Sequence, residues 1–438
     1  MTFQLPLFGT AKRARRACFF SLHPREKEKK FGAYAPKAMV HFAAKYNLPI
    51  IEDVKDLDAF DVVFFSLHCF RDFYLVARMA HHKRKGQEWI AGGNACATPA
   101  GVGWIMDYVY VGDCRGSFAR IIAGEREMPG MYDPRHPDRP IRYVDEDLHV
   151  EAITPTNIEM SKGCPRRCLF CIHPWRHRYQ EQPREVVEDF IRKFPKMRLG
   201  LISNSSDDVS YYEEISELLH ATGKQDMTVS NAVQSYSQKI AEQRKADMLF
   251  GVEGMSERLR WIVNKPISRD LLREKIDLCM STSGKLRVIY QFNLPGETER
   301  DIDEFESDVE YFRAKYTTGA LATTFIPNQP SAHTPFQWIV PRYSLATQAR
   351  LMDLRKRFIG SGKTGLGVYL PTPLGPKNWF SQVVAEWLPV TPTLDAAIQK
   401  LPQRAEVPEM IDALAARGVR LPAAFLARDR DAVFPWSN

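Results

Sequence analysis

The chain has 438 residues, of which 44% are hydrophobic and 26% are charged. This balance is typical of a globular protein, and the length favours two domains with an additional segment. No run of about 18 apolar residues occurs, which argues against a membrane-spanning helix. The apolar start of the chain is short, and basic residues follow it instead of preceding it, the wrong order for a secretory signal. We therefore expect a cytoplasmic protein with no membrane partner. The formal net charge of +7 permits an anionic partner without requiring one.

Strand-like and helix-like runs alternate in the first part of the chain. The strand-like runs are 18–22, 49–54, 62–66, 88–91 and 108–111, with helical patterns such as 35–45 and 73–84 between them. Such alternation predicts a parallel sheet covered on both faces, and hence an α/β, Rossmann-like doubly wound domain over residues 1–127. Sheets of this kind bind ligands in the loops beyond the carboxyl ends of their strands. Those loops include Gly92 and Gly93 as well as His23 and His68.

A second alternating series follows a linker, residues 128–150, that is rich in Pro, Asp and Arg. Its strand-like runs are 157–161, 199–202, 227–230, 248–252, 286–292 and 320–326. Strand–helix units in this number predict a partial (β/α)6 barrel of the TIM type over residues 151–341, with its chemistry at the carboxyl-end face. Residues 342–438 are punctuated by Pro and predict a mainly helical C-terminal region.

Three of the eight cysteines, Cys164, Cys168 and Cys171, fall in one segment directly after the first strand of the second series. The other five are scattered, which is typical of small buried side chains in a reducing compartment. Three thiolates can ligate three irons of a [4Fe–4S] cubane and leave the fourth iron open. A structural zinc ion with His173 as fourth ligand is the alternative, and the local spacing leaves both open.

The segment Cys164-Pro165-Arg166-Arg167-Cys168-Leu169-Phe170-Cys171 resembles the radical S-adenosylmethionine (SAM) superfamily, which has three cysteines spaced by three and two residues and an aromatic residue before the last. Residues 251–258, 264–265, 294–298, 327–330 and 334–338 resemble further segments of that family, in the expected order. The resemblance covers about residues 157–338. It implies a [4Fe–4S] cluster held by Cys164, Cys168 and Cys171, SAM bound at the open iron, and an external electron donor such as flavodoxin or ferredoxin.

The same resemblance implies further cofactor-binding residues. Phe170 occupies the position that lies near the adenine in the family. Ser203 and Asn204 begin a stretch, 203–208, that replaces the Gly-Gly-Glu-like motif of many members, so the identity of the contacting atom is open. Glu253, Ser256 and Arg258 are candidates for the polar end of SAM. For Glu253 and Arg258 the alternative is an ion pair on the rim of the barrel.

A doubly wound domain placed before a radical barrel resembles the cobalamin-binding domain of the cobalamin-dependent subclass. Gly92 and Gly93 follow its fourth strand, where the absence of side chains lets a large planar ligand approach the backbone. The Asp-x-His-x-x-Gly motif that supplies an axial histidine is missing, so we read His23 and His68 as loop or core residues. The alternative for the domain is one that keeps the fold without the ligand.

The domain pair implies reductive cleavage of SAM to a 5′-deoxyadenosyl radical, followed by cobalamin-dependent methylation of an unactivated carbon. One alternative is radical-initiated isomerisation, rearrangement or nucleic-acid base modification without methyl transfer. Another is a non-catalytic metal-binding protein. The substrate is open between a small molecule and a modified nucleic acid.

Overall fold

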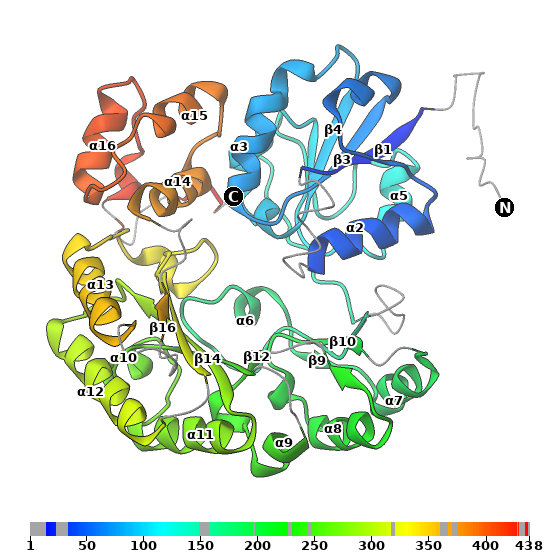
Figure 1. Ribbon diagram of the computed structural model, residues 1–438. Coiled ribbons are helices and arrows are strands. Elements are labelled where there is room, and N and C mark those ends of the chain that lie inside the picture. Colours follow the sequence, from blue (N-terminus) through cyan, green and yellow to red (C-terminus); the bar gives the residue numbers. More distant parts are fainter. Residues whose placement is uncertain are drawn as a thin grey trace. The chain divides into compact units, whose positions relative to one another are not determined.

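The computed structural model describes residues 15–22, 34–148, 157–195, 198–226, 230–243, 248–316, 320–359, 367–369, 375–426, 428 and 434–436. The chain divides into two compact units (Figure 1). The N-terminal unit comprises residues 1–146, 380–401 and 410–438, and the barrel unit comprises residues 147–379 and 402–409.

The N-terminal unit contains a sheet in the order β2-β1-β3-β4-β5-β6. Its strands are β1 (Ala17–Phe20), β2 (Ile50–Ile51), β3 (Val62–Ser66), β4 (Glu88–Gly92), β5 (Tyr108–Tyr110) and β6 (Met131–Tyr132). The first five pair in parallel and β6 is antiparallel. The order reverses at β1, as in flavodoxin-like doubly wound folds, so the predicted architecture is confirmed. The edge strand β6 was not expected, because its two residues lie in the segment read as a linker.

Apolar residues on both faces of this sheet explain why it is buried. The rings of Phe64 in β3 and Phe118 in α5 (Phe118–Ile122) have centroids 5.2 Å apart on one face. On the other face the rings of Phe65 and Trp89 lie 4.9 Å apart. Strands buried on both sides are read as continuous apolar runs, such as Val62–Ser66. The remaining helices of this part are α2 (Tyr34–Lys45), α3 (Phe70–Met79) and α4 (Ala100–Gly103), with short 3-10 turns η1 (Val54–Ala59), η2 (Ala80–His82) and η3 (Asn94–Ala97).

The helices near the C-terminus divide between the two units. Within the N-terminal unit, the Tyr74 hydroxyl of α3 donates to the Ser381 carbonyl at 2.7 Å, and Arg78 donates twice to Asp395, at 2.7 and 2.9 Å. The single C-terminal region expected over 342–438 is therefore helical but is not a separate body. Its elements are α13 (Leu345–Ile359), α14 (Pro376–Trp387), α15 (Pro392–Gln399), α16 (Val407–Ala415) and η8 (Ala423–Phe425).

The barrel unit contains two parallel sheets, ordered β11-β10-β7 and β12-β13-β14-β15-β16. The strands are β7 (Asn157–Glu159), β10 (Arg198–Ile202), β11 (Gln225–Asp226), β12 (Ser230–Asn231), β13 (Met248–Glu253), β14 (Lys285–Phe292), β15 (Ala320–Pro327) and β16 (Gly367–Tyr369). This is the predicted partial barrel. The strand expected at 227–230 lies partly outside the described residues, and β16 is a further strand that the sequence reading did not identify.

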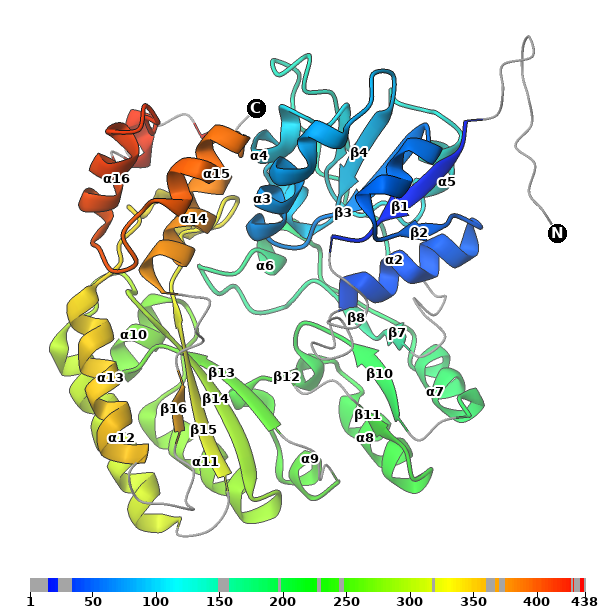
Figure 2. The same cartoon turned by 45° about the horizontal axis from the view of Figure 1, so that its top comes forward.

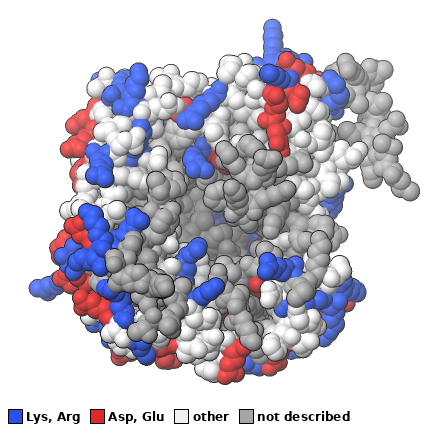
Figure 3. All heavy atoms as spheres, viewed as in Figure 1, with Lys and Arg blue, Asp and Glu red and all other residues white. Residues whose placement is uncertain are grey.

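Helices flank the strands of the barrel unit (Figure 2). The ring of Phe305, in α12, lies 5.0 Å from that of Tyr290 in β14 and 5.1 Å from that of Phe325 in β15. Figure 3 shows acidic and basic side chains interspersed where α12 and α13 lie, and there Arg350 pairs with Glu306 at 2.8 Å. The helices are α6 (His173–Arg176), α7 (Arg184–Lys193), α8 (Tyr212–Ala221), α9 (Gln238–Gln243), α10 (Glu257–Ile262), α11 (Arg269–Thr282) and α12 (Glu299–Lys315), with turns η4 (Ser206–Asp208), η5 (Val233–Ser235) and η6 (Pro335–Trp338).

None of the helices among the described residues has the length and apolar character needed to cross a bilayer.

Candidate active site

A short hairpin closes the loop that carries the three cysteines. Strands β8 (Ser161–Lys162) and β9 (Gln180–Glu181) pair antiparallel, so the loop begins and ends at the same place. Gly163, just before Cys164, has a φ of +72°. A Cβ atom there would lie 2.9 Å from the His177 carbonyl oxygen and 2.8 Å from that of Arg178. Only glycine fits this entry to the loop without displacing backbone.

Backbone hydrogen bonds attach the middle of the loop to two other segments of the barrel unit. The Leu169 N–H donates to the Val263 carbonyl at 3.0 Å, and the Asn264 side-chain amide donates to the Arg167 carbonyl at 2.7 Å. From the opposite segment, the Phe336 N–H donates to the Leu169 carbonyl at 3.2 Å. The turn after α10 and the η6 turn therefore fix the loop between them.

The segment after β10 holds the start of the loop. The Asn204 side-chain amide donates to the Gly163 carbonyl at 3.0 Å. The Ser203 and Ser161 hydroxyls lie 2.6 Å apart. Ser203 and Asn204, predicted to contact the cofactor, are thus brought to the cysteine loop and hydrogen-bonded to it.

An ion pair joins the interior of the cysteine motif to the same segment. Arg166, between Cys164 and Cys168, donates from two nitrogens to the two carboxylate oxygens of Asp208, each at 2.6 Å. The Ser205 hydroxyl donates to Asp208 at 2.6 Å, and Ser235 bonds to both partners. Burial would raise the pKa of Asp208, but the hydrogen bonds from Arg166 and the two serines outweigh burial and hold that pKa below its usual range.

The three thiols lie in a partly buried environment. Cys168 is buried, and Cys164 and Cys171 are half-buried. Burial raises the pKa of all three thiols, that of Cys171 to about 11. The Lys265 ammonium partly offsets this for Cys164 and Cys168, so that charge lies close to them. Thiols of this kind lose their protons on binding a metal cation, which supplies the compensating charge.

Among the described residues, no three His, Cys, Asp or Glu side chains meet in the way that one metal ion requires. His173, the alternative zinc ligand, starts α6, and burial lowers the pKa of its imidazole to about 4.

Glu253 ends β13 with its backbone in the left-handed region, at a φ of +70°. A register shift between β13 and β14 occurs here. One carboxylate oxygen lies 3.3 Å from the Lys265 ammonium, and the other accepts from the Gln291 amide at 2.8 Å. Residues other than glycine adopt this conformation at a cost, and such positions concentrate at functional sites. The Glu253 carboxylate adds to the burial that raises the pKa of Cys168 and Cys171, so its charge acts on the cysteines, as that of Lys265 does.

Ser256 and Arg258 lie at the start of α10 and contact the start of α12. The Ser256 hydroxyl accepts from the Leu259 N–H at 3.2 Å and donates to Asp301. Arg258 also pairs with Asp301 and donates to the Gly296 carbonyl at 2.7 Å. The rim ion pair considered between Glu253 and Arg258 is not formed, since each has another partner. A contact of Ser256 or Arg258 with SAM stays a prediction.

Phe170 is half-buried, and its ring centroid lies 6.5 Å from that of Phe336 in η6. Its predicted place near the adenine is not tested by this geometry.

Sequence reasoning missed the partners that hold these residues. Arg166 and Asp208 carry opposite charges in two segments that were both singled out, which was a usable signal. Gln291 and Asp301 gave no such signal, since no pattern in the sequence indicates that they contact β13 or α10.

In the N-terminal unit, Gly92 and Gly93 lie at the carboxyl end of β4. Gly93 has a φ of +107°, and a Cβ atom there would lie 2.4 Å from the Leu67 carbonyl oxygen. This close approach of the loops after β3 and β4 accounts for Gly93 by packing within the chain. His68 follows Leu67, and its N–H donates to the buried Asp72 at 2.6 Å. His23 lies outside the described residues.

Comparison with known proteins gives the class. Residues 158–309 match the family model of the radical SAM superfamily. The barrel unit therefore carries a radical SAM domain, and the protein is an enzyme. A curated relative, the uncharacterized protein MJ0966 of Methanocaldococcus jannaschii, is 22% identical over 367 residues, which are 76% of this chain and 82% of the relative.

Two solved structures share the fold. One is the radical SAM methyltransferase TsrM of Kitasatospora setae, solved with cobalamin and a [4Fe–4S] cluster. It superposes with a TM-score of 0.54 at 13% sequence identity, and the match spans 76% of this chain and 80% of the TsrM chain. The other is the cobalamin-dependent radical SAM enzyme OxsB, solved with aqua-cobalamin and SAM. Its TM-score is 0.53 at 13% sequence identity, and the match spans 81% of this chain and 57% of the OxsB chain.

Proposed function

We propose that this protein binds a [4Fe–4S] cluster, SAM and cobalamin, and methylates an unactivated carbon of its substrate. One observation carries the proposal: a flavodoxin-like sheet and a radical SAM barrel occur in one chain, in a fold shared with TsrM and OxsB. When bound, the cluster supplies the electron that cleaves SAM to a 5′-deoxyadenosyl radical, and cobalamin supplies methyl transfer. We further propose a cytoplasmic enzyme reduced by an external donor such as flavodoxin or ferredoxin.

The donor set suits the cluster. Cys164, Cys168 and Cys171 supply three thiolates from one loop, which the β8–β9 hairpin closes and the turns after β10, α10 and β15 fix. A rigid loop presents its ligands without a large ordering cost on binding. Lys265 offsets part of the negative charge that three thiolates gather.

The polar groups at the ends of β10 and β13 suit the polar end of SAM. Glu253 ends β13 beside the cysteines and is held by Lys265 and Gln291, so its carboxylate keeps one orientation. Ser203 and Asn204 follow β10. Hydroxyl and amide groups form hydrogen bonds with an amino or carboxylate group as the Gly-Gly-Glu-like motif does.

The sheet order suits cobalamin in the N-terminal unit. The order reverses between β1 and β3, and ligands of doubly wound folds bind beyond the carboxyl ends at that point. The loops there lead from Ser21 and from Leu67, while Gly92 is the last residue of the neighbouring strand β4. A Cβ atom on Gly92 would meet only Tyr110, at 3.9 Å, so this backbone is open to a close ligand.

Anaerobic turnover tests the proposal. The reconstituted protein should contain about four irons and matching sulfide, bind hydroxocobalamin with a change in absorbance, and form S-adenosylhomocysteine and 5′-deoxyadenosine together. Replacing Cys164, Cys168 and Cys171 by Ala should abolish the cluster signal in electron paramagnetic resonance. If 5′-deoxyadenosine formed without S-adenosylhomocysteine, the proposed methylation would be wrong, and the enzyme would only initiate a radical reaction. Stoichiometric zinc without iron would overturn the cluster.

A further inference from the structure

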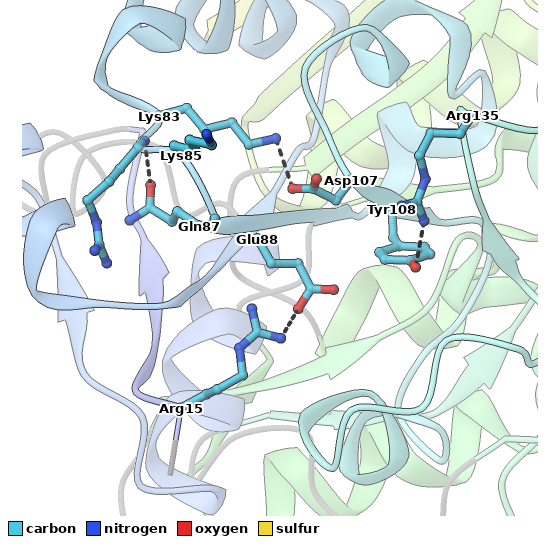
Figure 4. Close-up of a pocket in the computed structure, with 10 residues that line it drawn as sticks. Arg15, Lys83, Lys85, Gln87, Glu88, Asp107, Tyr108 and Arg135 are labelled. Atoms are coloured by element: carbon cyan, nitrogen blue, oxygen red, sulfur yellow. Dashed lines mark hydrogen bonds and ion pairs between the residues drawn. The ribbon is translucent and has the colours of Figure 1, made fainter. Parts of the chain in front are cut away.

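Two adjoining hollows open at the amino ends of β4 and β5, within the N-terminal unit. Figure 4 shows the first of them. Their volumes are about 580 and 560 Å³, and they share Tyr108 and Arg135. Glu88 begins β4 and Tyr108 begins β5, whereas Gly92 and Gly93 lie at the other end of the same sheet. We call the two hollows together the basic groove. It lies on the edge of the sheet away from the loops proposed for cobalamin.

Positive charge dominates the lining of the basic groove. The first hollow is lined by Arg15, Lys83, Arg84, Lys85 and Arg135, and the second adds Arg126, Arg139 and Arg142. Against these eight cations stand the four carboxylates of Glu88, Asp107, Glu127 and Asp133, a formal net charge of +4. This local excess attracts polyanions, since charge of one sign in a concave surface raises their local concentration.

The carboxylates hold several cations in fixed positions. Glu88 accepts from Arg15 at 2.8 Å and from Arg126 at 2.9 Å, and Asp133 accepts from Arg135 at 2.8 Å (Figure 4 shows the Arg15–Glu88 pair). The guanidinium groups of Arg126 and Arg135 lie 5.5 and 5.1 Å from the centroid of the Tyr108 ring. Arginines ordered in this way lose little side-chain entropy when a ligand binds.

Three cations of the basic groove are not committed to the protein. Lys85, Arg139 and Arg142 are exposed, and their side chains form no hydrogen bond or ion pair with the part of the chain that the structure describes. They are available to a ligand without breaking an internal ion pair.

The lining favours phosphates over an acidic protein. In the first hollow only Gly86, Gln87 and Tyr108 are uncharged, so apolar side chains of the kind that anchor protein interfaces are confined to the second hollow, among them Met128, Met131 and Ile141. Six of the eight cations are arginines, whose planar fork pairs with phosphate oxygens in a bidentate way. Cations spread over two adjoining hollows match a ligand whose charge repeats along a chain. Arg126 and Arg135 already lie against the Tyr108 ring, which leaves the phosphates, not stacked bases, as the recognised feature.

We propose that the basic groove binds the phosphate backbone of nucleic acid, with little preference for base sequence. Binding of this kind displaces counterions from the strand, so its affinity falls with salt in proportion to the number of phosphates neutralised. The inference does not depend on the proposed reaction, because it concerns a separate edge of the N-terminal unit.

Fluorescence anisotropy of the full chain with short labelled RNA and DNA oligonucleotides, measured over a range of salt concentrations, tests the proposal. The variant R139Q/R142Q removes two uncommitted cations and should bind about tenfold more weakly. Its salt slope should be shallower by about 1.4, since each phosphate contact contributes ~0.7 for single strands. The variant K400Q/R404Q is the matched control, because it removes the same charge at exposed positions that line neither hollow. It should bind like the unmodified chain.

Equal salt slopes for the two variants would overturn the proposal, as would the absence of binding at low salt. Competition identifies the ligand class: unlabelled oligonucleotide should displace the probe, and equal displacement by polyglutamate would overturn the assignment to nucleic acid. Cluster content and turnover do not enter this measurement, so a failed methylation assay leaves the result intact.

Discussion

Arg166 is the residue of the cysteine motif whose role the structure defines best. It lies between Cys164 and Cys168 and donates twice to Asp208, at 2.6 Å each. Its side chain is 23% exposed and that of Asp208 is 9% exposed, so removal of the arginine leaves a largely buried carboxylate with weaker partners. Loss of the hydrogen bonds from the arginine, while those from Ser205 and Ser235 remain, costs about 1.5–3 kcal/mol.

We therefore expect Arg166→Gln to loosen the cysteine loop and to lower iron and sulfide per chain, after anaerobic reconstitution, to half or less. Arg166→Lys keeps the charge but not the two-pronged geometry, and should recover part of the content. Iron and sulfide analysis with electron paramagnetic resonance measures both. Full cubane content in the Gln variant would show that the ion pair does not position the loop.

Glu297 provides a pH-dependent contribution to stability. Burial raises the pKa of this carboxyl to about 7, from 4.5, although backbone N–H groups and Thr347 favour its ionised form. Between these two values the folded chain holds more protons than the unfolded chain, so stability falls as pH rises through this range. In Glu297→Gln this loss should be absent. The difference in unfolding free energy, variant minus unmodified chain, should increase by about 1–3 kcal/mol from pH 5 to pH 8 in chemical denaturation. Parallel pH profiles would contradict the raised pKa.

At the residue scale, sequence identifies the residues of the cysteine motif more readily than the residues that hold the motif in place. The cysteines and Phe170 are recognisable because their spacing is local. Arg258 was a candidate for the polar end of SAM, which stays a prediction, and the sequence did not indicate that it pairs with Asp301, at the start of another helix. Such pairings depend on how β13, α10 and α12 pack, which residue spacing does not encode.

The β8–β9 hairpin is the element that sets the cysteine loop. Gly163→Ala would place a Cβ atom 2.9 and 2.8 Å from two carbonyl oxygens at a φ of +72°. We expect it to lower cluster content and the thermal midpoint. Gly284→Ala is the control, since its φ is +68° and a Cβ atom there meets nothing within 4 Å. The control should lose only about 1 kcal/mol of unfolding free energy, the cost of holding alanine at a positive φ. Equal losses in both variants would rule out the close approach as the cause.

At the element scale, apolar runs predicted most strands. Val62–Ser66 was identified without error, because both faces of that strand are buried and all but its last residue are apolar. The two-residue strands β6 and β8 have no periodicity to detect. They form because neighbouring elements offer unpaired backbone groups, a tertiary effect that propensity does not register.

At the scale of the whole molecule, neither compact unit is one continuous stretch of the sequence. The segment 380–401 completes the N-terminal unit through Tyr74, Arg78 and Trp104, whose indole donates to the Val390 carbonyl at 3.0 Å. Sequence reading divided the chain in linear order, since helical periodicity shows that a helix has an apolar face but not what covers it.

A chain ending at Gly375 should therefore keep the sheet of the N-terminal unit but lose the cover of α3. Amides of α3 should exchange hydrogen at least tenfold faster than in the full chain, while those of β14 keep their protection. Hydrogen exchange with mass spectrometry measures both segments in one experiment. Asp395→Asn, which removes only the charge opposite Arg78, should accelerate exchange in α3 to a smaller degree. Unchanged protection of α3 in the shortened chain would contradict the packing.

This division has a consequence for synthesis on the ribosome. Residues 147–379 are made between the two parts of the N-terminal unit, so the barrel emerges while its companion still lacks α15. Domains generally fold as units in the order of translation. Here the domain that begins first is completed last, and during that interval α3 lacks the cover that α15 later provides, which leaves a surface that a chaperone can recognise.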